Sequence, residues 1–220
     1  MKIFVDSSNL EEIKTASSWY LCEGVTTNPS SLGKLGKDPY KTVKAICQFI
    51  RGPVSMQVTS IDTDEMIREG KKIAQIAKNI VVKVASTRHG LNAIYELSKS
   101  GIKVNATNLF TPIQALVAAR NGASYVSCWM GRSDDIYMDS IELVRDTKEI
   151  FQVYKVKTQI IAASIKNTRQ IVEIAKVGVD IATIPFDVIE KMTQHPMTDM
   201  TFEGFLKDWK NNPALKNSSR

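Results

Sequence analysis

Short runs rich in β-branched residues recur along the chain, and each is followed by a stretch in which apolar residues return every three or four positions. The first run, KIFVD, is followed by SNLEEIKTASSWYL, and the third by TDEMIREGKKIAQIAKN. This alternation is typical of parallel strands that are joined by crossover helices. The runs are KIFVD, GVTTN, VSMQV, IVVKVAS, IKVNAT, SYVSCWM, TQIIAAS and VDIATIP.

Eight strand–helix units in 220 residues predict an α/β fold, namely an eight-stranded parallel β/α (TIM) barrel near the ~200-residue lower limit for that architecture. Runs such as IVVKVA and QIIAA are apolar on both faces, as expected of strands that helices cover on the outside. An open doubly wound sheet is the structural alternative. Its two common nucleotide-binding signatures, GxGxxG and GxxxxGK, are absent from the sequence. We expect residues 1–220 to form a single domain.

Composition limits the environment and the partners. The apolar runs are much shorter than a membrane span, and MKIFVDSS turns polar too early for a signal peptide, so we expect a cytoplasmic protein with no membrane partner. The net charge is +6, but the lysines are spread over most predicted helices, so we expect no nucleic-acid partner. Three widely spaced cysteines and only two histidines predict no metal site.

The segment TDMTFEGFLKDWKN, near the C-terminus, predicts one additional amphipathic helix at about residues 198–211. Phe202, Phe205 and Trp209 lie on or near one face of this helix. We expect the helix to pack on the barrel or on a neighbouring subunit.

Lys83 is the most unusual polar residue, because it interrupts the most apolar predicted strand, Ile80 to Ala85. Burial disfavours the charged form of a lysine and lowers its pKa, which makes the amine nucleophilic near neutral pH. A structural lysine paired with a carboxylate is the alternative. Asp6, at the end of the first predicted strand, either caps the helix that follows or points into the barrel mouth as an acid/base.

Other polar residues stand where the predicted strands end, which is where barrels of this type carry their chemistry. Pro29 keeps Asn28 out of helical geometry, so the Asn28 amide can face a ligand, although a polar turn explains the same pattern. Gln57, Thr107 and Ser127 are single polar residues near the ends of strands three, five and six.

A phosphate site is expected after strands six and seven. Arg132 lies in GRSDD, and Ser164 and Lys166 follow strand seven. A guanidinium, a hydroxyl, an ammonium and helix N-terminal amides together suit a phosphate. The alternative is that Arg132 pairs with Asp134 or Asp135 on the surface.

Seven motifs occur in a specific order and spacing: FVDSSN, GVTTNPS, VVKVAST, NATNLFTPIQALVAARNGASYVS, GRSDD, AASIKN and HPMTD. Together they resemble the short-chain transaldolase and fructose-6-phosphate aldolase family of class I Schiff-base aldolases, from Met1 to about Trp209. The resemblance implies an eight-stranded barrel, a lysine imine on strand four, and transfer or release of a dihydroxyacetone unit with no metal or organic cofactor. It also implies a homo-oligomer, a pentamer or a decamer, that assembles through the C-terminal helix.

The resemblance implies that Lys83 forms the imine and that Asp6 takes the proton of the C4 hydroxyl during cleavage. Gln57 and Thr107 would position the water that forms and breaks the imine. The remaining implied residues would bind the sugar-phosphate substrate. They are Asn28, Ser127 and Trp129 near the dihydroxyacetone unit, and Arg132, Ser164 and Lys166 near the phosphate.

Two positions depart from the transaldolase pattern. Residue 57 is Gln, as in the aldolases, where transaldolases usually have Glu; residue 129 is Trp, where transaldolases usually have Phe and the aldolases Tyr. We therefore carry three hypotheses. The first is a transaldolase of the pentose phosphate pathway that moves dihydroxyacetone from fructose 6-phosphate or sedoheptulose 7-phosphate to an aldose phosphate. The second is an aldolase that releases free dihydroxyacetone and glyceraldehyde 3-phosphate, and the third is a non-catalytic sugar-phosphate-binding barrel.

Overall fold

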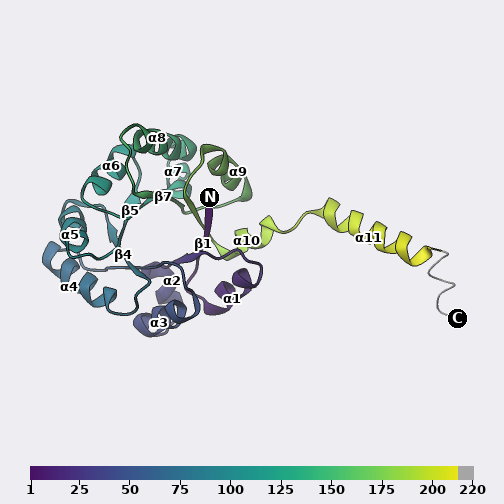
Figure 1. Cartoon of the computed structure of the whole chain (residues 1–220), viewed down its shortest axis with the longest axis horizontal. Helices are drawn as coiled ribbons and strands as arrows, with labels where there is room; N and C mark the ends of the chain where they lie inside the picture. Colours follow the sequence, from purple (N-terminus) through teal and green to yellow (C-terminus); the bar gives the residue numbers. More distant parts are fainter. Residues whose placement is uncertain (213–220) are drawn as a thin grey trace.

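The computed structural model describes residues 1–212 and contains a closed barrel of eight parallel strands in sequence order (Figure 1). The last strand pairs with the first, with Lys2 opposite Ile181 and Val5 opposite Ile184, so the sheet has no free edge. Helices surround the sheet on its outside. The predicted TIM barrel is therefore confirmed, and the open doubly wound sheet is excluded.

Each of the eight predicted runs coincides with one strand, although β5 extends two residues beyond the run IKVNAT. The strands are β1 (Lys2–Asp6), β2 (Gly24–Thr26), β3 (Val54–Gln57), β4 (Ile80–Ala85), β5 (Val104–Leu109), β6 (Tyr125–Trp129), β7 (Gln159–Ala163) and β8 (Ile181–Ile184). The register between β5 and β6 shifts between Ala106 and Leu109, and Asn108 there has a positive φ of 60°. The other pairs run in regular parallel register.

Most helices begin after a polar residue whose side chain accepts a backbone N–H from the first turn, as Asn9, Asp62 and Thr111 do. The helices of the barrel are α1 (Leu10–Ser18), α2 (Pro29–Lys34), α3 (Pro39–Phe49), α4 (Thr63–Ala74), α5 (Arg88–Lys99), α6 (Pro112–Arg120), α7 (Met130–Asp134), α8 (Ser140–Val153), α9 (Thr168–Val177) and α10 (Phe186–Met192). None of the helices in residues 1–212 is long and apolar enough to cross a membrane.

The predicted C-terminal helix is α11 (Pro196–Asn211), which extends away from the barrel (Figure 1). All of its residues are exposed, including Phe202, Phe205 and Trp209. The helix therefore buries no side chain against the barrel of its own chain. Packing on a neighbouring subunit, the other expectation from the sequence, stays a prediction.

Two separate apolar clusters hold the barrel together. The larger one fills the space between the strands and the surrounding helices. The smaller one lies inside the barrel, and we call it the apolar plug; it consists of Phe4, Val81, Tyr125, Ile161, Ala163 and Ile181. Gly24 makes room for it, because a Cβ at this position would lie 2.6 Å from the Phe4 ring.

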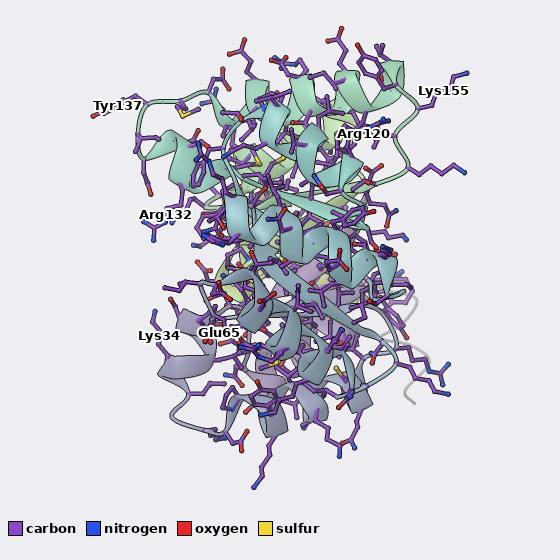
Figure 2. The ribbon with its side chains drawn as sticks, turned by 90° about the vertical axis from the view of Figure 1, so that its left-hand side faces the viewer. Lys34, Glu65, Arg120, Arg132, Tyr137 and Lys155 are labelled. Carbon is purple, nitrogen blue, oxygen red and sulfur yellow. The ribbon has the colours of Figure 1, made fainter. Side chains whose placement is uncertain are left out.

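The two ends of the barrel carry different parts of the chain. Figure 2 shows Lys34, in the helix that follows β2, at one end of the barrel together with Arg132 and Tyr137, which follow β6. Arg120, just before β6, and Lys155, just before β7, lie at the other end. The first group marks the C-terminal ends of the strands, where the sequence predicts the site.

Candidate active site

Polar side chains lie inside the barrel towards the C-terminal ends of the strands, some of them level with the apolar plug; Ser127, for example, stands opposite Ile161 in the register. Because side chains alternate along a strand, residues two positions apart share a face, so Asp6 follows Phe4 and Lys83 follows Val81 into the interior. We call this group the polar layer; it consists of Asp6, Thr26, Ser55, Lys83, Asn105, Ser127 and Thr183. Apart from Asp6, each of these residues is at most 6% exposed.

Lys83 is buried in the middle of β4, with only 6% of its surface exposed. Its Nζ donates a hydrogen bond to the Thr27 carbonyl oxygen at 3.3 Å, and no carboxylate in residues 1–212 forms a salt bridge with it. Burial lowers the pKa of Lys83, whereas the charge of Asp6 raises it to a smaller extent. The alternative of a structural lysine held in a salt bridge therefore lacks its partner in this part of the chain.

Asp6 ends β1 and is close enough to Lys83 for each charge to influence the other's pKa. Burial raises the pKa of the Asp6 carboxyl, against the lowering effects of Lys83 and of hydrogen bonds from Thr26 and Asn28. The Thr26 hydroxyl donates to Asp6 Oδ1 at 3.3 Å. The N-cap of α1 is Asn9 rather than Asp6, so the capping role that the sequence left open for Asp6 is excluded.

Asn28 is the N-cap of α2, which agrees with the polar turn; the ligand-facing role of its amide stays a prediction. Its Oδ1 accepts the Ser31 N–H at 2.8 Å and caps α2, while its side chain also lowers the pKa of Asp6 through a hydrogen bond. The cap fixes the orientation of the amide, because the oxygen is held by the helix. The Asn28 nitrogen is thereby directed towards the carboxylate.

Ser127 belongs to a buried network that the sequence analysis missed. Its hydroxyl donates to Asn105 Oδ1 at 2.8 Å, and Asn105 Nδ2 donates to Ser55 Oγ at 3.3 Å. Asn105 is fully buried and stands directly opposite Lys83 in the sheet register. The signal was present, because Asn105 lies two residues before Thr107 and so shares its inward face.

The upper rim of the barrel interior carries Gln57, Thr107 and Trp129. Gln57 stands opposite Lys83 in the register of β3 and β4. The Trp129 indole N–H donates to Thr107 Oγ1 at 3.0 Å, and its ring packs at a tilt against Phe110 with centroids 6.1 Å apart. Thr107 therefore has its own hydroxyl hydrogen still available for a further acceptor.

The loops after β6 and β7 meet at Gly131. The Gly131 N–H donates to the Ser164 carbonyl oxygen at 2.9 Å, and a Cβ at residue 131 would lie 2.6 Å from Cε of Lys166. Ser164 has a positive φ of 60°, a conformation that costs a residue with a side chain about 1–2 kcal/mol. Arg132 follows Gly131, so the three residues expected at the phosphate come from segments in contact.

The Arg132 side chain also forms the surface pair that the sequence offered as an alternative. Its Nη1 lies 3.7 Å from Asp135 Oδ2, and both side chains are more than half exposed. An exposed pair at this separation contributes at most about 1 kcal/mol to stability. The guanidinium is therefore only weakly held by Asp135.

The buried lysine in a polar layer towards the C-terminal ends of a parallel barrel agrees with one family of known proteins. A family model described as Transaldolase/Fructose-6-phosphate aldolase matches residues 3–217. The chain belongs to this family. Its members are enzymes, which excludes the non-catalytic barrel as a family-level description.

Relatives from the family cover nearly the whole chain. The chain is 49% identical over 214 residues to a "Probable transaldolase" of Caldicellulosiruptor saccharolyticus, covering 97% of this chain and 99% of that protein. It is 46% identical to proteins of the same name from Hydrogenobaculum sp., with 97% and 98% covered, and from Methanococcus vannielii, with 95% and 97% covered.

A more distant likeness concerns the fold alone. The inosine 5'-monophosphate dehydrogenase of Legionella pneumophila superposes with a TM-score of 0.58 at 14% identity, covering 86% of this chain and 56% of that chain.

Residues 1–212 contain no group of three or more His, Cys, Asp or Glu side chains arranged to hold a metal ion.

Proposed function

We propose that this family member is a transaldolase, which transfers a dihydroxyacetone unit from a ketose phosphate such as fructose 6-phosphate or sedoheptulose 7-phosphate to an aldose phosphate. The observation that carries the proposal is the buried Lys83 with its lowered pKa, next to Asp6 at the C-terminal end of the barrel. Only the neutral amine can attack a ketone, and burial increases the neutral fraction at a given pH.

In the proposed reaction the Lys83 amine attacks C2 of fructose 6-phosphate, and loss of water gives an imine. Asp6 then removes the proton of the C4 hydroxyl, the bond between C3 and C4 breaks, and glyceraldehyde 3-phosphate leaves. The electron pair stays on the dihydroxyacetone unit as an enamine. The enamine attacks the aldehyde of erythrose 4-phosphate, Asp6 returns its proton to the oxygen of that aldehyde, and hydrolysis of the new imine frees sedoheptulose 7-phosphate and Lys83.

The neighbouring polar groups suit the remaining steps. Asn28 and Ser127 would bind the hydroxyls of the dihydroxyacetone unit, and the bonds from Ser31 and to Asn105 support their orientation. Gln57 and Thr107 would position the water of imine formation and hydrolysis. Trp129 would border the substrate on this side, since its N–H is already bound to Thr107.

Arg132, Ser164 and Lys166 are the proposed phosphate ligands. Replacing Arg132 with Ala should raise KM for phosphorylated substrates by roughly tenfold or more, because a charge-assisted hydrogen bond worth about 1.5–3 kcal/mol is lost. Steady-state kinetics with an unphosphorylated ketose serve as the control. An equal loss on both kinds of substrate would mean that Arg132 is structural.

Two assays test the proposal. Borohydride in the presence of fructose 6-phosphate should reduce an imine onto Lys83, and peptide mass spectrometry should find the added mass there and nowhere else. Turnover should be faster when erythrose 4-phosphate is present. A label on another lysine would reject the Lys83 mechanism, while equally fast release of free dihydroxyacetone without acceptor would favour the aldolase.

We also propose a homo-oligomer, a pentamer or a decamer, in which α11 packs on a neighbouring copy. The support is that α11 exposes an apolar set that its own barrel does not cover, namely Met197, Met200, Phe202, Phe205, Leu206 and Trp209. Sedimentation of the full chain should show an assembly, and Phe205→Glu should weaken it. A monomer at micromolar concentration would reject this arrangement.

A further inference from the structure

Helix α7 and the loop after β7, which carry the proposed phosphate ligands, are joined by one buried side chain. Gln170 is the third residue of α9 and is 7% exposed. Its Oε1 accepts the Lys166 N–H at 2.7 Å, and its Nε2 donates to Asp134 Oδ2 at 2.6 Å. One amide therefore connects the loop after β7 with the end of α7.

Asp134 extends this connection to the next helix. Its second oxygen, Oδ1, accepts the Ser140 N–H at 3.3 Å, so the carboxylate joins the end of α7 to the start of α8. The short helix that carries Arg132 is thus held at both ends. Gly131 is bonded to the Ser164 carbonyl at one end, and Asp134 is bonded to Gln170 at the other.

We propose that Gln170 is a positioning residue for phosphate binding, which sets the spacing between Arg132 and the Ser164–Lys166 segment through its bond to Asp134. The inference rests on the proposed function of that site. The role is one of positioning rather than catalysis, because both ends of the Gln170 amide bind protein groups. Its buried position also keeps the bond to Asp134 away from competing water.

The chain offers a matched control at the start of α6. Gln114 is also the third residue of its helix, and its Oε1 accepts the N–H groups of Phe110 and Thr111 at 2.9 and 3.2 Å. This amide closes a helix cap in the same way but joins no loop of the proposed phosphate site. Gln114→Leu therefore reproduces the loss of a cap without the loss of the connection.

The test compares Gln170→Leu with Gln114→Leu in the full chain. We expect Gln170→Leu to raise KM for fructose 6-phosphate, and the inhibition constant of inorganic phosphate, by about five- to tenfold, with kcat changed by less than about twofold. The kcat/KM for unphosphorylated fructose should stay near the wild-type value. Gln114→Leu should leave the ratio of phosphorylated to unphosphorylated kcat/KM unchanged.

A charge-conserving exchange tests the bond itself. Gln170→Glu places two carboxylates against each other and should weaken phosphate binding at least as much as Gln170→Leu. Adding Asp134→Asn should restore it to within about twofold, because the donor and the acceptor then exchange sides. If Gln170→Leu does not fold, the comparison of Gln170→Glu with the double variant tests the positioning role of Gln170 in its place.

Equal effects of Gln170→Leu on fructose and fructose 6-phosphate, or a double variant as weak as Gln170→Glu, would overturn the positioning role. Failure of the proposed function would be visible earlier and separately. In that case the wild type itself would form no imine and show no turnover with fructose 6-phosphate.

Discussion

The apolar plug and the polar layer inside the barrel are built largely from the same strands but hold opposite chemistry. Phe4 and Val81 belong to the apolar plug, whereas Asp6 and Lys83, two residues further along β1 and β4, belong to the polar layer. One step of about 6.6 Å along a strand thus separates packing from chemistry. The plug fills the barrel and excludes water from below, and the same exclusion shifts the pKa values of the two ionisable groups above it.

The largest expected effect concerns the polar layer. Asp6→Asn should slow the cleavage of fructose 6-phosphate by about 10²–10⁴-fold, because general-base assistance is lost. Imine formation should persist, since Asp6 raises the pKa of Lys83 and its removal lowers that pKa further. Borohydride trapping and kcat, measured on the same preparation, separate the two steps. Parallel loss of trapping and cleavage would instead assign Asp6 to imine formation or to folding.

Substitutions in the apolar plug should lower stability rather than activity. Phe4→Ala should lower the free energy of unfolding by about 3–5 kcal/mol, because a fully enclosed ring is replaced by a cavity. The kcat of the molecules that remain folded at low temperature should change little. Urea denaturation and active-site titration measure the two quantities. A large loss of kcat at unchanged stability would mean that the plug takes part in catalysis.

Making the polar layer resemble the plug should stabilise the fold. We expect Asp6→Leu combined with Lys83→Met to raise the free energy of unfolding by about 1–4 kcal/mol and to abolish activity, because a partly buried and a buried ionisable group are replaced by apolar ones. Calorimetry of both proteins provides the measurement. A clear loss of stability would show that the interaction between Asp6 and Lys83 contributes more free energy than the burial of their charges costs.

The part of the pH dependence of stability that comes from Asp6 and Lys83 should disappear in the same double variant. In the folded wild type the pKa of Lys83 lies below its ordinary value of 10.5. Between these two pH values the unfolded chain binds more protons than the folded chain, so this group makes stability rise with pH there. The raised pKa of Asp6 makes stability fall as pH increases above 3.8. The difference between wild type and variant, followed from pH 4 to 10, isolates both contributions.

The smallest expected effect lies at the rim, in the partition between transfer and release. Protonation of the enamine on Lys83 gives free dihydroxyacetone, and the Trp129 indole has a single N–H, which already binds Thr107. Trp129→Tyr should therefore increase release by a few-fold, since a hydroxyl can hold the water concerned. Gln57→Glu should increase transfer, because a carboxylate can act as a base and an amide cannot. The ratio of transfer product to free dihydroxyacetone, with and without erythrose 4-phosphate, measures the effect of each substitution. A shift of this ratio in the opposite direction would contradict the corresponding prediction.

The sequence by itself determined the fold. Apolar periodicity and turn residues placed all eight strands and the C-terminal helix, because several strand runs are apolar on both faces, as expected between a filled barrel interior and a ring of helices. The same pattern made Lys83 conspicuous, since a lysine inside IVVKVA has no solvent-facing side to occupy. Seven motifs in order were sufficient to indicate the family that the comparison then showed.

Only the tertiary structure decided which polar side chains meet. Ser55, Asn105 and Ser127 come from three strands, and their bonds depend on sheet register, which no local pattern contains. The bond between Gln170 and Asp134 joins residues 36 positions apart, so neither residue stood out in the sequence. The direction of α11 could not be predicted from the local sequence either. Amphipathic periodicity predicts a helix, but packing decides which surface covers its apolar face.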